Sequence, residues 1–292
     1  MTNIPHLFGG DWTAEKLERV RKYLVAYATI MSKKHFRFAY IDAFAGTGYR
    51  TKAKSSDPSF LFPELLEDES QEFLDGSARI ALQVKPRFHK YIFIESDPKR
   101  YAELEKLREE FPALRDDIIF EPSDANTYLQ DLCENRDWSK RRAVLFLDPY
   151  GMQVTWSTIE AIASTRAIDL WILFPLGIGV NRMLPRRGGI NEAWRRKLDM
   201  IFGTTDWYES FYRTEVTQGF FGEQTSTEKI SDFDSIGQYF VKRLKTVFVG
   251  VAENPRPLFN SRNIPLYLLC FASGNPRGAE TAIKIAQDIL RK

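Results

Sequence analysis

The sequence has few of the residues that build metal centres and disulfide frameworks. Its 292 residues include 2 cysteines, Cys133 and Cys270, and 3 histidines, none of them spaced as metal ligands. We therefore expect no disulfide framework and no bound metal, and the sparse thiols fit a reducing cytosol. The sequence also lacks an apolar run of about 20 residues and a basic start followed by an apolar stretch, so we expect a cytoplasmic protein without a membrane span or signal peptide.

An excess of charge of one sign is also missing. The 41 Lys and Arg residues nearly balance the 39 Asp and Glu residues, for a net charge of +2. Domains that bind nucleic acid through bulk charge usually have a pI above about 9, and here the pI is about 8.4. Any argument for nucleic acid must therefore come from where the charges lie. The hydrophobic share of 43% is enough for a buried core.

Short apolar segments alternate with helical patterns along much of the chain. Nearly continuous apolar strands joined by amphipathic helices are typical of a parallel sheet covered on both faces. We therefore predict an α/β fold, a doubly wound Rossmann-like sheet formed by residues 1–176 and 241–292, in which one of the last strands is antiparallel. The predicted strands are 37–44, 91–95, 118–120, 143–147, 170–175, 247–252 and 266–272, and the main predicted helices are 13–32, 156–164 and 278–290.

Residues 177–240 differ in composition from the rest of the chain. This stretch is rich in Arg, Trp, Phe and Gly and does not continue the alternation of strands and helices. We predict that it is a mainly helical insertion on the substrate or partner side of the sheet.

A polar residue follows each of the first four predicted strands. Asp42 precedes a glycine turn that contains Gly46 and Gly48, and Glu95, Asp124 and Asp148 end or follow the next three strands. The carboxyl ends of parallel strands meet at one rim, where doubly wound folds bind their ligands. The same order is expected for an S-adenosylmethionine pocket, with the turn under the methionine portion, the second acid on the ribose and the third on the adenine. The predicted cofactor-binding residues are Asp42, Phe44, Ala45, Gly46, Gly48, Glu95, Ser96, Asp124 and Ala125.

Other nucleotide sites fit this pattern less well. A nicotinamide-binding turn needs Gly-x-Gly-x-x-Gly at the start of a helix, whereas Gly48 is followed by Tyr49-Arg50-Thr51. A P-loop is excluded because the chain has no Gly-Lys-Ser/Thr. Each acid also has a simpler interpretation. Asp42 can cap the turn or the following helix, Glu95 can cap the helix that starts near Asp97, and Asp124 can be an ordinary turn acid.

The motif Asp148-Pro149-Tyr150-Gly151 is the predicted catalytic centre. Methyl transfer to an exocyclic amine needs acceptors for the N–H bonds, and the Asp148 carboxylate and the Pro149 carbonyl can supply them. Tyr150 can stack on a base, and Gly151 leaves room for the incoming ring. The alternative is a strand-end turn with a buried tyrosine.

Basic residues gather beside aromatic residues in the predicted insertion, in the pairs Arg186-Arg187 and Arg195-Arg196. Together with Gly151, these four arginines are the predicted substrate-binding residues, since cations bind phosphates and rings stack on bases. A third basic cluster lies at Lys140-Arg141-Arg142. The alternative is a solvated helix face, which is common for charge clusters.

These motifs together resemble the three-Cys-motif partner protein family, TcmP, whose members are methyltransferase-like and bacterial. The resemblance spans most of the chain and implies a class I methyltransferase fold, S-adenosylmethionine as cofactor and a partner protein with a three-cysteine, radical-enzyme-like motif. It is carried by Asp42-Ala43-Phe44-Ala45-Gly46-Thr47-Gly48, Asp75-Gly76-Ser77, Phe93-Ile94-Glu95-Ser96-Asp97, Phe146 to Gly151, and Asn275-Pro276-Arg277-Gly278.

A second resemblance concerns the substrate. Asp148-Pro149-Tyr150-Gly151 resembles the Asp-Pro-aromatic-Gly motif of tRNA guanine-N2 dimethyltransferases and lacks the second proline of adenine-N6 methyltransferases. It favours an amine of RNA over DNA as methyl acceptor. Two alternatives stay open: an accessory subunit that binds the cofactor and supports its partner, and a protein methyltransferase.

Overall fold

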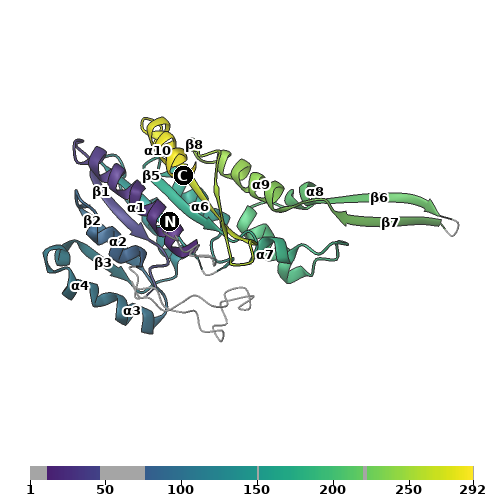
Figure 1. Cartoon of the computed structure of the whole chain (residues 1–292), viewed down its shortest axis with the longest axis horizontal. Coiled ribbons are helices and arrows are strands. Elements are labelled where there is room, and N and C mark those ends of the chain that lie inside the picture. Colours follow the sequence, from purple (N-terminus) through teal and green to yellow (C-terminus); the bar gives the residue numbers. More distant parts are fainter. Residues whose placement is uncertain (1–11, 47–75, 150, 220–221, 292) are drawn as a thin grey trace, which may run out of the picture.

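The computed structural model describes residues 12–46, 76–149, 151–219 and 222–291. In these ranges an eight-stranded sheet has the order β3-β2-β1-β4-β5-β10-β8, with β9 also paired to β10 (Figure 1). Strands β1 to β5 are parallel to one another, whereas β10 is antiparallel to β5, β8 and β9. The strands are β1 (Arg37–Asp42), β2 (Lys90–Ile94), β3 (Ile118–Glu121), β4 (Arg141–Leu147), β5 (Ile168–Phe174), β8 (Gly250–Val251), β9 (Arg256–Phe259) and β10 (Pro265–Ser273).

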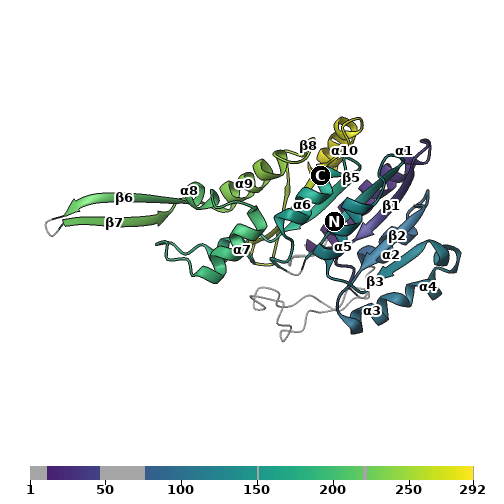
Figure 2. The same cartoon turned by 180° about the vertical axis from the view of Figure 1, so that it is seen from behind.

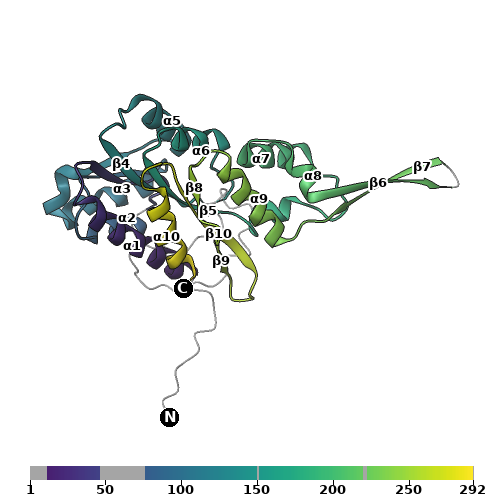
Figure 3. The same ribbon diagram turned by 90° about the horizontal axis from the view of Figure 1, so that it is seen from above.

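Helices cover both faces of this sheet, as Figure 3 shows from above. One face is covered by α1 (Trp12–Met31), α2 (Ser77–Gln83) and α10 (Ala279–Arg291). The other is covered by α5 (Ala125–Asn135), α6 (Trp156–Ser164) and α9 (Phe233–Lys245). The link between β2 and β3 contains α3 (Pro98–Glu105), α4 (Leu107–Glu110) and the 3-10 helix η2 (Pro112–Asp117).

The central strands supply both hydrophobic cores. Tyr40 and Val144 are buried in the core under α1, whereas Ile41 and Leu145 are buried in the core under α6. Successive strand residues point to opposite faces, so a strand covered on both sides has to be apolar throughout. The predicted parallel α/β sheet is therefore confirmed, including the antiparallel strand near its end.

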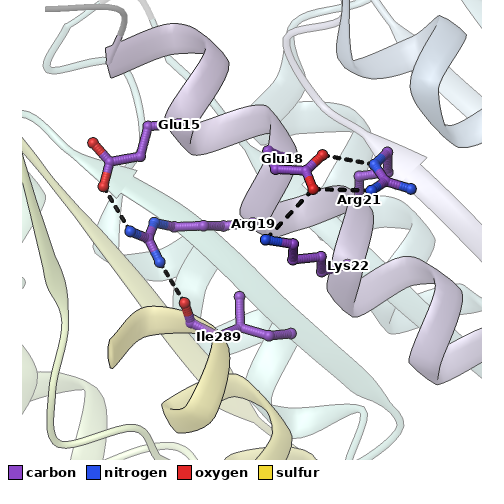
Figure 4. Close-up of polar contacts among 6 residues, drawn as sticks. All are labelled: Glu15, Glu18, Arg19, Arg21, Lys22 and Ile289. Carbon is purple, nitrogen blue, oxygen red and sulfur yellow. Dashed lines mark hydrogen bonds and ion pairs between the residues drawn. The ribbon is translucent and has the colours of Figure 1, made fainter. Parts of the chain in front are cut away.

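Polar contacts fix α1 against the last part of the chain. The Arg19 guanidinium donates to the backbone oxygen of Ile289 in α10 and, at 2.7 Å, to the Glu15 carboxylate (Figure 4). Glu15 also accepts a 2.8 Å hydrogen bond from Arg256 of β9. On the outer side of the helix, Glu18 pairs with Arg21 at 2.7 Å. These contacts set the position of α1, which also contributes a residue to the candidate site.

The segment 177–240 contains a long hairpin as well as helices. The hairpin projects from the body of the molecule, as Figures 1 and 2 show. The prediction of a mainly helical insertion did not include this pair of strands. The predicted boundary at residue 240 falls inside α9, where Phe240 stacks on Phe174 of β5 with ring centres 4.0 Å apart. The elements of this segment before α9 are η3 (Val180–Met183), α7 (Glu192–Phe202), α8 (Trp207–Phe211), β6 (Tyr212–Gly219) and β7 (Gly222–Lys229).

Candidate functional site

The candidate site lies at the carboxyl ends of the parallel strands. In the sheet, β1 lies between β2 and β4. From β1 the chain continues to β2 and β3 on one side, and it then returns to β4 and β5 on the other side, so the strand order reverses at β1. Ligands of doubly wound folds bind outside the strand ends at such a switch point. Asp42 ends β1, Asp148 follows β4, Glu95 follows β2 and Asp124 follows β3, so all four predicted acids lie along this rim.

A polar hollow of about 220 Å³ opens beside these strand ends. It brings together five of the predicted cofactor-binding residues, which are Phe44, Glu95, Ser96, Asp124 and Ala125. Sequence analysis did not identify the other residues of its wall. Some adjoin the predicted residues at the ends of β1, β2 and β3, and the rest come from the loop after β4 and from helices α3 and α7. The hollow is lined by Ala43, Phe44, Ile94, Glu95, Ser96, Arg100, Ser123, Asp124, Ala125, Met152, Gln153 and Met200.

Glu95 is the buried acid of this hollow, with 6% of its surface exposed. One carboxylate oxygen accepts a 2.8 Å hydrogen bond from the backbone N–H of Asp97, and the Arg100 Nε lies 4.0 Å away. The other oxygen accepts no hydrogen bond from the described residues. A buried carboxylate gains from a further donor, so Glu95 is equipped to bind a hydroxyl group.

Asp124 caps a helix. One of its oxygens accepts hydrogen bonds from the backbone N–H of Thr127 at 3.0 Å and from its hydroxyl at 3.1 Å, as is typical of an N-cap. Asp124 therefore caps α5, while its contact with the adenine stays a prediction. It also lines the hollow, where its second oxygen accepts no hydrogen bond from the residues that the structure describes.

Asp42 lies beneath the glycine turn and does not line the hollow. It is fully buried, and the Tyr40 hydroxyl donates to it at 3.1 Å. Burial raises the pKa of Asp42 to about 7 against the lowering effect of the Ser77 hydroxyl, and the Asp148 carboxylate raises this pKa further. Asp42 is thus placed to support the turn.

The turn above Asp42 begins as predicted. The backbone N–H of Ala43 donates to Phe146 in β4 and that of Ala45 donates to Ile94 in β2, both at 3.1 Å. Gly46 has φ = 60°, a conformation that costs glycine little. The backbone therefore spans the switch point closely, and the predicted Gly48 lies outside the described residues.

Asp148 forms an ion pair that sequence analysis missed. Its carboxylate pairs with the ammonium of Lys16 from α1, and Lys16 is only 4% exposed. The Lys16 Nζ lies 5.0 Å from the Trp12 ring centre and 5.9 Å from that of Phe146. A buried ammonium needs a counter-charge, and Lys16 therefore fixes the Asp148 carboxylate. The sequence signal was present, since Lys16 lies one turn before Val20 on the apolar face of its helix.

The rest of the predicted catalytic motif is partly described. Pro149 and Gly151 are buried next to Asp148, and Met152 after them lines the hollow. The end of β4 therefore lies beside the hollow, as the catalytic prediction requires. Tyr150 lies outside the described residues, and its stacking role stays a prediction.

The predicted substrate arginines separate into two groups. Arg195 in α7 lies over the rings of Tyr208, at 4.5 Å, and Trp207, at 5.6 Å, and Arg196 pairs with Glu192 at 3.2 Å on the exposed side of the same helix. Arg186 and Arg187 lie in the loop after η3 and are exposed. Phosphate contact by all four arginines stays a prediction.

The third basic cluster lies away from the site. Arg141 begins β4, so residues 140–142 are at the amino ends of the strands, opposite the rim that carries the acids. The Arg142 guanidinium lies 4.0 Å from the ring centre of Phe36. This cluster therefore packs locally and does not face the hollow.

The described ranges contain neither a metal-binding cluster nor a membrane-spanning helix. No group of three or more His, Cys, Asp and Glu side chains in those ranges is placed to hold a metal ion. No helix in the same ranges has the length and apolar character needed to cross a bilayer.

Comparison with known proteins identifies similar folds. No protein-family model matches the chain, and no curated protein sequence is similar to it. Protein LPL1258 of Legionella pneumophila is 16% identical with a TM-score of 0.47, and the match covers 97% of this chain and 92% of that one. For Trm1 of Pyrococcus horikoshii, solved with S-adenosylmethionine, the identity is 10%, the TM-score 0.43 and the coverage 92% and 58%. An rRNA methylase of Streptococcus thermophilus is 11% identical with a TM-score of 0.31, and the match covers 73% of this chain and 95% of that one.

Proposed function

We propose that this protein is an S-adenosylmethionine-dependent methyltransferase that acts on an exocyclic amine of a nucleic acid, with RNA favoured. The observation that carries the proposal is the rim itself. In the hollow at the switch point lies Glu95, a buried acid with one oxygen that no described residue uses. Beside it, the Asp-Pro motif follows the end of β4.

The described residues fit the parts of the cofactor. Glu95 would accept from the ribose hydroxyls with its unused oxygen, and Asp124 and Ala125 would lie beside the adenine. The closely bound turn from Ala43 to Gly46 would support the methionine portion. Phe44, which is half-buried in the wall of the hollow, adds an apolar surface of the kind that ligand pockets use.

The chemistry asked of the protein is mainly positioning. S-adenosylmethionine, when bound, would supply an electrophilic methyl group to the amine nitrogen, with S-adenosylhomocysteine as the leaving group and the amine proton released to water. Asp148 and the Pro149 carbonyl would accept the amine N–H groups and so aim the nitrogen lone pair at the methyl group. Holding reactants in line can contribute about 7–11 kcal/mol to a barrier. Lys16 would keep the Asp148 carboxylate in one place during this step.

The cofactor part of the proposal is tested by titration calorimetry with S-adenosylmethionine. A hydrogen bond to a charged group contributes about 1.5–3 kcal/mol, so we expect Glu95→Gln to weaken binding about 10- to 100-fold. Glu103→Gln is the matched control, because Glu103 is exposed and pairs with Lys106 on the surface. Equal affinities of the wild type and Glu95→Gln would refute the assigned role.

The transfer part is tested with a methyl-labelled cofactor and RNA or DNA from cells that lack the protein. We expect label in RNA, and we expect Asp148→Ala to abolish it while cofactor binding persists. Label in DNA or in protein would identify a different substrate class.

An accessory role is the second candidate, because Asp148 is already paired with Lys16. In that role the protein binds the cofactor and serves a partner with a three-cysteine motif. Cofactor binding without methyl transfer, together with co-purification of such a partner, would favour it. Transfer by the isolated protein would exclude it.

A further inference from the structure

A second hollow lies at the base of the projecting hairpin. It measures about 440 Å³ and is lined by Asn181, Arg186, Glu228, Lys229 and Ser231. Asn181 belongs to η3, Glu228 and Lys229 end β7, and Arg186 lies in the loop between η3 and α7. The hollow is thus built where the hairpin meets the segment that follows β5.

Backbone contacts hold its two cations near each other. The backbone N–H of Lys229 donates to the carbonyl oxygen of Arg186 at 2.9 Å. The Lys229 ammonium donates to the side-chain oxygen of Asn181 at 2.6 Å, and it is half-buried. The Arg186 side chain is exposed. One fixed cation and one adaptable cation therefore share the hollow.

The charges of these cations are not neutralised by ion pairs. Within the described ranges, no carboxylate oxygen lies within 4.0 Å of a side-chain nitrogen of Arg186 or Lys229, whereas Arg196 in α7 is paired with Glu192. Glu228 also lines the hollow, so the lining has two cations against one carboxylate. Asp232 approaches Lys229 closely enough to favour its charged form, against the effect of burial.

A hydroxyl group of the hollow is also unused. The Ser231 Oγ is buried and forms no hydrogen bond with any residue that the structure describes. Buried polar atoms without a partner are uncommon in folded proteins, and each one points to a missing water, ion or ligand. Two unpaired cations beside an unused hydroxyl form a donor set that suits a phosphate group.

The hollow is connected to the candidate methyl-transfer site through short packing contacts. Gly179, two residues before Asn181, packs so closely on Met152 that a Cβ atom there would lie 2.9 Å from the Met152 sulfur. Met152 lines the cofactor hollow. The segment that supplies Asn181 therefore packs against the wall of the cofactor hollow.

We propose that the hollow formed by Asn181, Arg186, Lys229 and Ser231 binds a backbone phosphate of the nucleic-acid substrate. This inference rests on the proposed function and adds a specific contact outside the cofactor site. It also gives the hairpin base a role, since β7 supplies one of the two cations.

The test is the salt dependence of RNA binding. The probe is a fluorescent single-stranded RNA of about 12 nucleotides, and the variants are Arg186→Gln, Lys229→Gln and the double variant. Each lost phosphate contact lowers the slope of log affinity against log salt by about 0.7 for single strands, which corresponds to about five-fold in affinity at about 0.1 M salt. Because both cations contact the same phosphate, we expect the double variant to lose this one contact, about five-fold in affinity, and each single variant to lose less.

Two controls separate this inference from general effects. Lys242→Gln removes an exposed cation from α9, outside the hollow, and is expected to change affinity by less than two-fold. The double variant is expected to bind S-adenosylmethionine as the wild type does, because neither cation lines the cofactor hollow. Lost cofactor binding in the wild type itself would instead refute the proposed function.

The outcomes are distinct. RNA binding that the double variant leaves unchanged would overturn the inference. If the wild type binds no RNA but binds inorganic pyrophosphate, and the double variant does not, the hollow takes a free phosphate compound and the nucleic-acid source is wrong. If the wild type binds neither probe, the phosphate site is refuted.

Discussion

Replacing Lys16 by methionine tests whether α1 completes the candidate site. The substitution keeps the length of the side chain and removes the cation that pairs with Asp148. Lys16 is buried and Asp148 is partly hydrated, with 5% and 21% of their side chains exposed. Breaking a fully buried pair costs about 3–5 kcal/mol, and an exposed pair contributes at most about 1 kcal/mol. We therefore expect Lys16→Met to lower the free energy of unfolding by about 2–3 kcal/mol.

The measurement is urea unfolding followed by tryptophan fluorescence, in a double-mutant cycle with Asp148→Asn. Asp148→Asn leaves the more deeply buried ammonium without a counter-charge and is expected to cost about 3–5 kcal/mol. The double variant removes both charges, and we expect it to recover about 2 kcal/mol relative to the sum of the single changes.

A matched control separates the pair from a general loss of lysine. Lys22 lies on the outer side of the same helix, is half exposed and pairs with Glu18 at 3.5 Å. Lys22→Met is expected to change stability by less than about 0.5 kcal/mol. If Lys16→Met behaves like Lys22→Met, or if the two changes at the pair are additive, the ion pair does not position Asp148.

Three further substitutions test separate parts of the structure. The pKa of the Asp42 carboxyl is raised from 3.8 to about 7. Protonated Asp42 therefore adds to the free energy of unfolding, fully below about pH 4, and this contribution is lost as the pH rises through about 7. Asp42→Asn should remove this loss, which is at most about 4 kcal/mol, and parallel pH profiles of the two proteins would contradict it. Asp124→Ala should cost about 1 kcal/mol in urea unfolding through the lost helix cap; an unchanged midpoint would show that the cap is dispensable. Gly203→Ala should cost more than about 2 kcal/mol in thermal unfolding, because Gly203 has φ = 65° and a Cβ atom there would lie 2.0 Å from Trp156; a soluble variant with an unchanged midpoint would refute this packing.

The sheet could be predicted from the sequence because its signals are local. β4 is apolar over its length, and acids follow β2 and β3 at the point where helices begin. β4 is apolar because both of its faces are buried, and the acids after β2 and β3 are explained in large part by helix capping. Those acids were predicted for their chemistry, and Asp124 shows that one carboxylate can cap a helix and line a ligand hollow together.

The features that sequence analysis missed depend on contacts between distant segments. Lys16 lies on the apolar face of its helix, but its partner is identified only when the fold places Asp148 beside it. Phosphate contact by Arg195 stays a prediction, but its position over Tyr208 and Trp207 is visible only in the fold. The hairpin had a local signal, since Thr214, Val216, Thr225 and Thr227 alternate with polar residues. That signal was outweighed by the aromatic residues of the helices before it.

The position of α1 has a consequence for the order in which the described parts of the chain can fold during synthesis. Lys16 finds its counter-charge 132 residues later, and Arg19 finds the Ile289 carbonyl 270 residues later. Until β10 and α10 leave the ribosome, the first helix has an incomplete surface to pack on, and its apolar side is available to chaperones or to the wrong strand. The candidate site is therefore among the last parts of the molecule to become ordered, and a nascent chain that ends before α10 is expected to carry an unfinished pocket.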